Sequence, residues 1–446
     1  MKVIVAGAGE AGTYLADLLY KAKKNIIILD TNKERLNYID SHYDFLTHQG
    51  SATSIFDLNS IGIAQTDLFI ALTHIEEVNI TAGILAKKMG AKKVITRIDN
   101  REYLELENVD FFKELGIDSL IYPEILASDE IVNLLSKVGV SKSYSFENGK
   151  LFLFAIKIKE NAPILYKTLQ EVTKESGDFE FRAVAITRDQ KTIIPKGFNA
   201  FHEGDMFYVI CKPEAVNKLM TLSGKKDFKV ENIMIMGGSR IGLKTAQKCE
   251  KKSNVKLLEQ SREKCEDLSE LLENTLVIHG DGRDTELLKE EGLQGMDVFI
   301  AVTGNSETNI LSCLHAKKMG VPKTIAEIEK IDYLPLAEEM GIETVINKKT
   351  IAASHIYAHI MSEQVASVQC LLDSDAEILE FTVADGAKIT KKALKDIKFP
   401  KKAIIGGVIR GDDVFIAKGD TIIQPNDKVV LFSLPEAINK LGKFFV

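Results

Sequence analysis

The sequence repeats itself, and this duplication constrains the fold more than any other feature. Residues 67–99 (DLFIALTHIEEVNITAGILAKKMGAKKVITRID) match residues 297–329 (DVFIAVTGNSETNILSCLHAKKMGVPKTIAEIE) without a gap. The same spacing of 230 positions relates Gly7 to Gly237. A register held over this length indicates two copies of one structural unit and not a chance match.

A second pair of segments repeats with a different spacing. Residues 213–219 (PEAVNKL) match residues 435–441 (PEAINKL), which lie 222 positions later. The chain therefore has the order A–B–A′–B′, which predicts a pseudo-twofold relation within one chain. We expect four domains: two large ones over 1–138 and 230–365, and two small ones over 142–224 and 370–446.

The large units alternate short apolar runs with helical patterns. In the first, apolar runs cover Lys2–Ala6, Ile26–Leu29, Phe69–Leu72 and Val94–Ile98, and a helical segment covers Glu76–Met89. Strands that alternate with helices of this length are typical of βαβ units on a parallel sheet. The sequence thus predicts an α/β protein in which two Rossmann-like, doubly wound parallel-sheet domains alternate with two small, strand-rich α+β domains.

A glycine-rich turn follows the first strand. It reads Gly7-Ala8-Gly9-Glu10-Ala11-Gly12, and Asp30 ends the next strand. In the dinucleotide-binding pattern, the first glycine permits the turn, the second admits a pyrophosphate, and the third lets helix and strand pack closely. Asp30 would accept hydrogen bonds from ribose hydroxyls and repel a 2′-phosphate, which favours NAD(H) over NADP(H). The alternative is a turn that needs glycine beside an acidic residue facing water.

The second unit carries an altered copy of this turn. It reads Gly237-Gly238-Ser239-Arg240-Ile241-Gly242, with Glu259 in the place of Asp30. Ser239 leaves phosphate contact open, while Arg240 can pair with additional phosphate oxygens that Glu10 would repel. We therefore expect a dinucleotide in the first site and ADP or ATP in the second. The alternative is a second unit that serves only as scaffold.

Polar residues follow the central strands at their carboxyl ends, where ligands bind in such sheets. Thr73 and Thr303 stand at corresponding positions and are candidate contacts for the nucleoside. Thr73 can equally cap the next helix, and Asn79 can be a buried polar group. Arg97, whose counterpart is Glu327, is a candidate phosphate contact or a surface ion pair.

Recognisable catalytic chemistry is missing from the sequence. The small units contain one histidine, His202, and a dehydrogenase would need an acid–base group there. His355 and His359 have helical spacing in a segment expected to be helical over 351–369, but no adjacent glutamate completes a zinc motif. The five scattered cysteines suggest neither disulfides nor a zinc site. We expect no catalytic residues and no metal site.

Composition narrows the class of partner. Lys and Arg number 57 against 64 Asp and Glu, a net charge of −7 that argues against a nucleic-acid binder. The sequence has no apolar run long enough to span a membrane, which indicates a soluble, cytoplasmic protein. Two nucleotide-sized sites without chemistry favour a sensor whose ligands shift a conformational equilibrium and which acts on a partner.

The duplicated glycine turns, the A-x-T-x-x-x-x-x-N segments and the strand-rich module after each unit resemble the TrkA family, built from RCK (KTN) domains. The resemblance covers essentially the whole chain. It implies alternating TrkA-N and TrkA-C domains, binding of NAD(H) and adenine nucleotides, and assembly as a homo-oligomeric dimer or tetramer ring. The implied partner is a membrane potassium-translocating subunit of the TrkH/TrkG type, with this chain peripheral on the inner face of the cell membrane.

The resemblance carries over to individual residues where the motifs match. These are Gly7, Gly9, Gly12, Asp30 and Thr73 in the first copy, and Gly237, Gly242, Glu259 and Thr303 in the second. The first copy has Ser51 where the second has Asp281, so it lacks that acidic contact. Two competing functions stay open: a soluble NAD-dependent oxidoreductase, and a structural adaptor with vestigial pockets.

Overall fold

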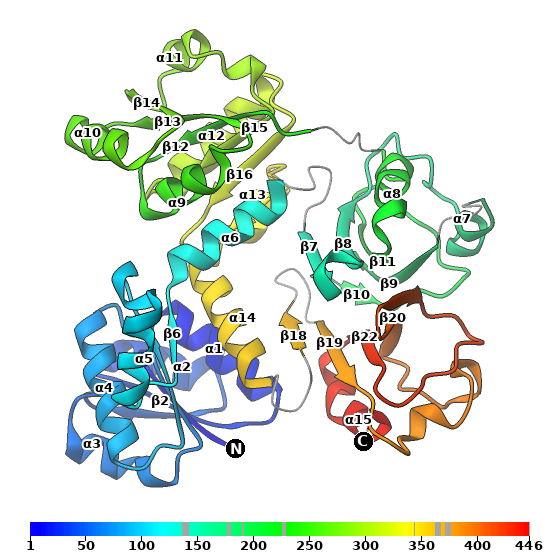
Figure 1. Ribbon diagram of the computed structural model, residues 1–446, viewed down its shortest axis with the longest axis horizontal. Coiled ribbons are helices and arrows are strands. Elements are labelled where there is room, and N and C mark those ends of the chain that lie inside the picture. The colour runs from blue at the N-terminus through cyan, green and yellow to red at the C-terminus, as the bar shows by residue number, and fades with distance from the viewer. Residues whose placement is uncertain are drawn as a thin grey trace. The chain divides into compact units, whose positions relative to one another are not determined.

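The protein contains two parallel and two antiparallel sheets, in alternation along the chain. The structure is a computed structural model that describes residues 1–135, 142–175, 180–189, 191–224, 229–342, 344–361, 367–370 and 376–445 (Figure 1). The two parallel sheets have six strands each and the two antiparallel sheets have five. This arrangement confirms the fold class expected from the sequence.

The first parallel sheet has the strand order β3-β2-β1-β4-β5-β6. Its central strands β1 and β4 are apolar and almost wholly buried, because helices cover both faces of such a sheet. The order reverses between β1 and β4, and ligands bind at such switch points. The strands are β1 (Lys2–Ala6), β2 (Asn25–Asp30), β3 (Leu46–Gln49), β4 (Leu68–Ala71), β5 (Lys93–Arg97) and β6 (Ser119–Ile121). The helices are α1 (Glu10–Lys21), α2 (Lys33–His42), α3 (Ile55–Ser60), α4 (Glu76–Lys88), α5 (Leu106–Glu114) and α6 (Pro123–Leu135).

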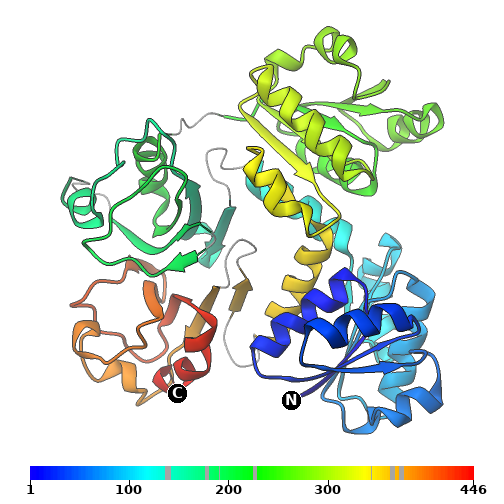
Figure 2. The same cartoon turned by 180° about the vertical axis from the view of Figure 1, so that it is seen from behind.

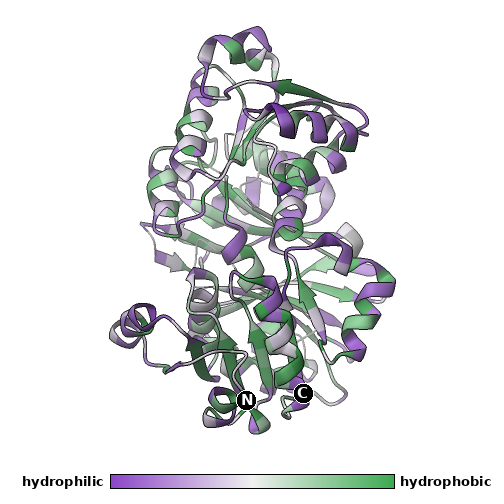
Figure 3. Ribbon diagram, turned by 90° about the vertical axis from the view of Figure 1, so that its left-hand side faces the viewer, coloured by the Kyte–Doolittle hydropathy of each residue, from purple (hydrophilic) through white to green (hydrophobic). Residues whose placement is uncertain are grey.

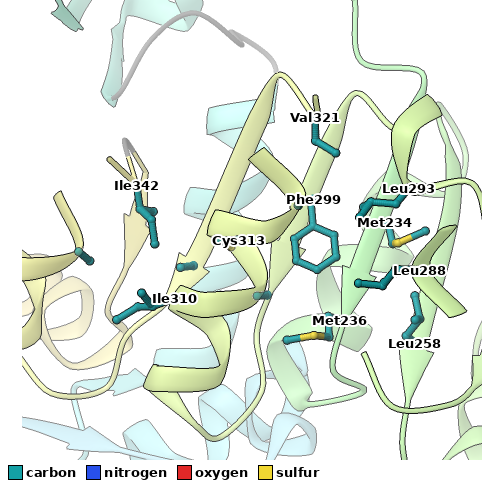
Figure 4. Close-up of a cluster of buried hydrophobic side chains, with 14 of the residues drawn as sticks. Met234, Met236, Leu258, Leu288, Leu293, Phe299, Ile310, Cys313, Val321 and Ile342 are labelled. Atoms are coloured by element: carbon teal, nitrogen blue, oxygen red, sulfur yellow. The ribbon is translucent and has the colours of Figure 1, made fainter. Parts of the chain in front are cut away.

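The second parallel sheet repeats this plan, with the order β14-β13-β12-β15-β16-β17. Phe299 of β15 lies in the middle of its core, and Cys313 of α12 packs beside it, both fully buried (Figure 4). The strands are β12 (Asn232–Met236), β13 (Asn254–Glu259), β14 (Thr275–His279), β15 (Val298–Ala301), β16 (Lys323–Glu327) and β17 (Val345–Ile346). The helices are α9 (Arg240–Cys249), α10 (Arg262–Leu271), α11 (Thr285–Glu290), α12 (Ser306–Lys318), α13 (Tyr333–Glu339) and α14 (Lys348–Met361).

The last helix of each large unit packs, wholly or in part, with the other large unit. The chain forms two compact units, residues 1–127 with 347–360, and residues 128–346 with 361–446. Helix α14 therefore belongs with the first parallel sheet and lies beside α1 (Figure 2). The second half of α6 belongs with the second sheet, where Lys248 Nζ lies 2.7 Å from Asp129 Oδ1. Each half of the chain thus supplies a helix to the other half.

One predicted helix is too long. The sequence pattern predicts a helix over 351–369, whereas α14 ends at Met361 and residues 367–370 form the strand β18. This strand pairs antiparallel with β19, Ser367 opposite Glu380. Long-range pairing with a strand later in the chain overrides the local pattern here, as tertiary context often does.

The two small units are five-stranded antiparallel sheets that share a core. Phe154 and Phe207 fill the core of the first unit. A further buried cluster joins Tyr208 of the first unit to Phe432 of the second, so the two sheets pack against each other. The first sheet has β7 (Lys142–Phe146), β8 (Leu151–Lys157), β9 (Phe181–Arg188), β10 (Lys191–Ile193) and β11 (Met206–Cys211), with α7 (Leu169–Glu175) and α8 (Val216–Leu222). The second has β18 (Ser367–Cys370), β19 (Glu377–Thr382), β20 (Ala403–Arg410), β21 (Asp413–Ile416) and β22 (Lys428–Ser433), with α15 (Pro435–Phe445).

A buried ion pair is duplicated in the small units. Arg188 donates from Nε and Nη2 to the two carboxylate oxygens of Asp205, each at 2.7 Å. Arg410 makes the same two bonds to Asp427, each at 2.8 Å. The side chain of Asp205 is 0% exposed and that of Asp427 is 1% exposed. The pair sits at the same 222-residue spacing as the sequence repeat, so the duplication extends to side-chain contacts.

Apolar residues concentrate on the strands, and hydrophilic residues lie on the outer helix faces (Figure 3). Within the described ranges, no helix is long and apolar enough to cross a membrane. Four cysteines, Cys211, Cys249, Cys265 and Cys313, are buried and are not joined in disulfides. Burial raises the pKa of the Cys249 thiol to about 11, so this cysteine is protonated at neutral pH. The side chain of Cys370 lies outside those that the structure describes.

Candidate functional site

The first glycine turn connects β1 to α1, and two of its glycines are sterically required. Gly7 has a φ of +116°, and a Cβ there would lie 2.9 Å from the carbonyl oxygen of Leu72. A Cβ on Gly12 would lie 1.9 Å from the carbonyl oxygen of Gly7. Gly9 differs, because a Cβ there would meet none of the described atoms within 4 Å. The turn is therefore closed behind Gly7 and Gly12 and open in front of Gly9.

The open side of this turn faces the start of α1. Gly9 is the residue before the helix and offers no side chain to cap it. The first N–H groups of any helix lack partners within the helix, and its positive dipole end attracts anions. Glu10, Ala11 and Gly12 supply these first amides. This arrangement can bind a phosphate through backbone amides.

Asp30 lies beside the turn, at the end of β2. Its Oδ2 accepts the backbone N–H of Ala8 at 2.6 Å, and its Oδ1 accepts that of Asn32 at 2.7 Å. The two bonds fix the carboxylate at the carboxyl edge of the sheet. Each carboxylate oxygen has a further lone pair, so the group can also accept bonds from a pair of ribose hydroxyls.

Asn79, on helix α4, links the segments that follow β4 and end β5. It is 1% exposed. Its Oδ1 accepts the Thr73 hydroxyl at 2.6 Å, and its Nδ2 donates to the carbonyl oxygen of Arg97 at 3.2 Å. The Thr73 hydroxyl also lies 3.1 Å from the carbonyl oxygen of Ile75. These contacts place both side chains in a network that shapes the carboxyl edge of the sheet.

Arg97 is the last residue of β5, at the same edge. Its Nη2 lies 3.0 Å from Asp99 Oδ1, which is the ion pair anticipated as one of its two roles. Its Nε is buried and has no hydrogen-bond partner among the described atoms. A buried N–H without a partner is costly, and it is satisfied when an acceptor arrives. Arg97 can thus offer one more bond to a ligand.

Sequence reasoning missed an acidic group in the first site. Asp281 of the second copy has no acidic counterpart at Ser51 in the first copy. The structure places the carboxylate of Asp57 there instead, with Oδ2 accepting the Ser51 N–H at 2.8 Å. A Cβ on Gly50 would lie 2.7 Å from Asp57 Cγ, so the glycine is what admits this side chain. In the sequence, the only sign of this contact is that Asp57 follows Gly50 by seven positions.

The second glycine turn has the same backbone shape as the first, but Gly238 and Glu259 stand where the first site has Ala8 and Asp30. Glu259 bridges the N–H groups of Gly238 and Ser261, both at 2.8 Å, as Asp30 does in the first site. A Cβ on Gly238 would lie 2.8 Å from Glu259 Oε2, where the first site tolerates Ala8. The longer acid is therefore accommodated by the smaller residue in the turn.

The start of α9 differs chemically from the start of α1. The hydroxyl of Ser239 accepts the N–H of Gly242 at 3.2 Å and caps the helix. One amide that is available to a phosphate in the first site is thus satisfied by the protein in the second. Arg240 is the next residue, and its side chain is exposed. The second site therefore offers a phosphate one backbone amide fewer and one exposed cation more than the first.

The end of β15 repeats the network seen at the end of β4. The Thr303 hydroxyl donates to Asn309 Oδ1 at 2.6 Å, and Asn309 Nδ2 donates to the carbonyl oxygen of Glu327 at 2.8 Å. Asp281 lies at the end of the neighbouring loop, and hydrogen bonds from Arg283 lower the pKa of this carboxyl. Asp281 is therefore already engaged by a cation.

A pocket of about 880 Å³ lies between the two small units. Its walls include Lys174, Arg182 and Lys196 from the first unit and Lys418 from the second. Lys418 also pairs with Glu180. The sequence does not predict this pocket, because its walls come from segments that are distant in the chain and meet only through the shared core.

The other candidates for chemistry do not gather into a site. His355 and His359 lie on α14 with exposed side chains, in line with an ordinary helix face. Over the ranges that the structure describes, no three His, Cys, Asp or Glu side chains are placed to hold a metal ion.

Two known domain families match the chain, each of them twice, and together they cover most of its length. The TrkA-N domain model matches residues 3–123 and 233–348. The TrkA-C domain model matches residues 153–224 and 378–446. The chain is 32% identical over 454 residues to "Trk system potassium uptake protein TrkA homolog 1" of Methanosarcina mazei, with all of both chains covered. It is 33% identical over 439 residues to "Trk system potassium uptake protein TrkA" of Vibrio alginolyticus, with 97% of this chain and 95% of that protein covered.

Solved structures of similar fold are RCK-domain proteins. The GsuK RCK domain superposes with a TM-score of 0.60 at 14% identity, covering 99% of this chain and 94% of that chain. The GsuK channel bound to NAD superposes with a TM-score of 0.59 at 14% identity, covering 100% of this chain and 78% of that chain. The GsuK structure bound to ADP covers 81% of this chain and 69% of that chain, with a TM-score of 0.50 at 12% identity. These likenesses establish a shared fold.

Proposed function

The chain belongs to the TrkA family of Trk potassium uptake systems, and from this premise we propose that it is a nucleotide-sensing regulatory subunit. In this proposal it binds NAD(H) in the first glycine-turn site and ADP or ATP in the second. Binding shifts a conformational equilibrium of the duplicated units. The shift gates a membrane potassium-translocating subunit of the TrkH/TrkG type.

The observation that carries the proposal is the difference between two otherwise matching turns. The first is uncapped and open in front of Gly9, with Asp30 fixed beside it. A pyrophosphate needs this close approach to backbone amides, and a ribose diol needs the acid. Asp30 would repel a 2′-phosphate, which favours NAD(H) over NADP(H). Gly7, Gly12, Thr73 and Arg97 are assigned to the same site.

The second turn suits a ligand that depends less on backbone amides. Ser239 occupies the amide of Gly242, while Arg240 brings a positive charge to the same place. A terminal phosphate of ADP or ATP carries more negative charge than a pyrophosphate diester, so it gains more from an arginine. Gly237, Glu259 and Thr303 complete the site. The GsuK protein, which shares this fold, has been solved with NAD and with ADP.

A regulator needs no catalytic group, and we propose that the chain is not an enzyme. A hydride-transfer enzyme requires an acid–base residue within reach of its substrate. The sequence carries no recognisable catalytic motif next to either glycine turn. A soluble NAD-dependent oxidoreductase stays the competing function, and turnover of NADH with a small carbonyl substrate would support it.

The proposal places the chain in the cytoplasm, on the inner face of the cell membrane. The membrane subunit conducts potassium, and this chain is its cytoplasmic partner. Assembly as a homo-oligomer, a dimer or a tetramer ring, would multiply the nucleotide sites presented to one pathway. Coupling between sites then follows from the difference in affinity of each ligand for the open and closed states.

Two variants test the division of ligands. Binding of NADH and of ATP to the full chain is measured by calorimetry. Asp30→Ala should weaken NADH strongly and spare ATP, whereas Arg240→Ala should chiefly weaken ATP. Lys21→Gln, at the far end of α1, serves as a surface control. Equal loss of both ligands in both variants would contradict the two-site division, and no saturable binding in the wild type would favour a structural adaptor.

A further inference from the structure

A residue from the second half of the chain reaches the first glycine turn. Lys349, on α14, donates from Nζ to Glu10 Oε2 at 2.6 Å, across 339 positions of sequence. Glu10 directly follows Gly9 and is the first residue of α1. The Lys349 side chain is 31% exposed and that of Glu10 is 43% exposed. The ammonium group therefore lies at the solvent-facing rim of the turn.

The start of helix α14, which carries Lys349, is fixed by buried and hydrogen-bonded residues. Asn347 and Thr350, on either side of Lys348 and Lys349, are 2% and 1% exposed. The N–H of Thr350 donates to Asn347 Oδ1 at 2.9 Å, which caps the start of the helix. Lys348 lies 3.7 Å from the carboxylate of Glu124. Because its neighbours are buried and bonded, α14 fixes the position from which the Lys349 side chain extends toward Glu10.

The charge at this rim is arranged differently in the two repeats. In the second repeat the turn itself supplies a cation, Arg240, at the position of Glu10. Sheet register shows that Ile121 and Ile346 correspond, since they pair with Arg97 and Glu327 respectively. Counting three residues on from each isoleucine, Glu124 of α6 corresponds to Lys349 of α14. The charge at this position is therefore reversed between the repeats, as it is between Glu10 and Arg240. In the first repeat, then, the cation at the turn comes from α14 and not from the turn.

An incoming phosphate would compete with Glu10 for this cation. The phosphate would bind in front of Gly9, where the helix amides are unsatisfied, and Glu10 would repel it. A lysine side chain is flexible and carries three donors, so it can move from a carboxylate to a nearby phosphate. The exchange would neutralise the ligand and would change the tie between α14 and α1.

We propose that Lys349 is a phosphate-binding residue of the first nucleotide site, and that it leaves Glu10 for the ligand when NAD(H) binds. This inference rests on the proposed function, since it needs a phosphate ligand at that turn. It makes α14, which comes from the second half of the sequence, part of the first site.

The test compares variants of the full chain with three ligands. Lys349→Gln should weaken NADH and ADP-ribose by on the order of tenfold, as expected for loss of one charge-assisted hydrogen bond. The same variant should leave adenosine, which has no phosphate, unchanged. Lys349→Arg keeps the charge and should retain most of the affinity. Lys21→Gln removes the same charge at the opposite end of α1, far from the turn, and should have no effect.

A double variant separates direct contact from neutralisation of Glu10. Glu10→Gln alone should tighten NADH, because it removes both the repulsion and the competitor. If Lys349 contacts the phosphate, Lys349→Gln should still weaken NADH when Glu10→Gln is present. If Lys349 only neutralises Glu10, the effect should vanish in that background, and the inference would be wrong.

Other outcomes distinguish this inference from the proposed function. If the wild type does not bind NADH at all, the proposed function fails. If the wild type binds NADH, Asp30→Ala weakens it and Lys349→Gln does not, only the inference fails. Thermal unfolding of each variant shows whether it is folded, and a folded Lys349→Gln variant with wild-type affinity overturns the assignment.

Discussion

Replacing Gly12 by alanine should destabilise the first parallel-sheet unit through a single backbone clash. The new methyl carbon would sit 1.9 Å from the carbonyl oxygen of Gly7, and real Cβ contacts stay above 3.0 Å. Helix α1 and the turn must therefore separate by about 1 Å. A rearrangement of this size in a packed region costs about 1–3 kcal/mol of stability. Alanine gives back about 0.5–1 kcal/mol through its better helix propensity. The expected net loss of about 1 kcal/mol should lower the unfolding midpoint of that unit by about 2–4 °C.

The matched control is Gly9→Ala, three residues earlier in the same turn. Its φ of −75° suits any residue, and a methyl group there meets no described atom within 4 Å. Losing glycine at the position before the helix costs about 0.5 kcal/mol, so thermal stability should stay near that of the wild type. The methyl group would nevertheless stand where a phosphate must approach, and NADH affinity should fall.

Scanning calorimetry and NADH titration of both variants check this pair of expectations. Gly12→Ala should show the lower midpoint, and Gly9→Ala should show the loss of NADH binding at nearly unchanged stability. The reasoning would be refuted if Gly12→Ala unfolded at the wild-type temperature. It would also be refuted if Gly9→Ala lost as much stability as Gly12→Ala.

Three further predictions follow from individual contacts. Ser239→Gly should free an amide at the start of α9 and cost only a few tenths of a kcal/mol; titration should show NADH binding in the second site gained or tightened, and an unchanged stoichiometry and affinity would count against the role of the cap. Asp205→Asn should break the buried bond pair with Arg188 and cost about 2–4 kcal/mol, discounted because the arginine is 34% exposed; denaturant unfolding checks this, and a loss below 1 kcal/mol would contradict it. Burial raises the pKa of Glu380 above its usual 4.5, so the unfolded chain ionises first as pH rises and the folded state loses stability above about pH 4.5. Glu380→Gln should therefore be more stable than the wild type at pH 7 and equal to it at pH 4, and equal stability at pH 7 would refute this sign.

Much of the fold was predictable because local patterns and the repeat agree. The expected strand Lys2–Ala6 has the bounds of β1, and the expected helix Glu76–Met89 differs from α4 by one residue. The duplication predicted four alternating domains because each unit carries its own apolar periodicity. These signals are short-range, and short-range signals survive folding when burial supports them.

What the sequence did not show depends on contacts between distant segments. No local pattern indicates that α14 packs with the first sheet or that Lys349 meets Glu10. The helix predicted to run to residue 369 ends at Met361, because later residues pair with β19. The site shows the same limit, since Asp57 reaches the place of the missing acid only through the fold.

Potassium flux through reconstituted membranes tests the central claim most directly. The membrane potassium-translocating subunit is incorporated in vesicles, and flux is measured with the full chain present, with NADH, with ATP or with neither. We expect flux to depend on the chain and to differ between the nucleotides. Asp30→Ala should remove the response to NADH and keep the response to ATP. Flux that is the same with and without the chain, under every nucleotide, would contradict the account.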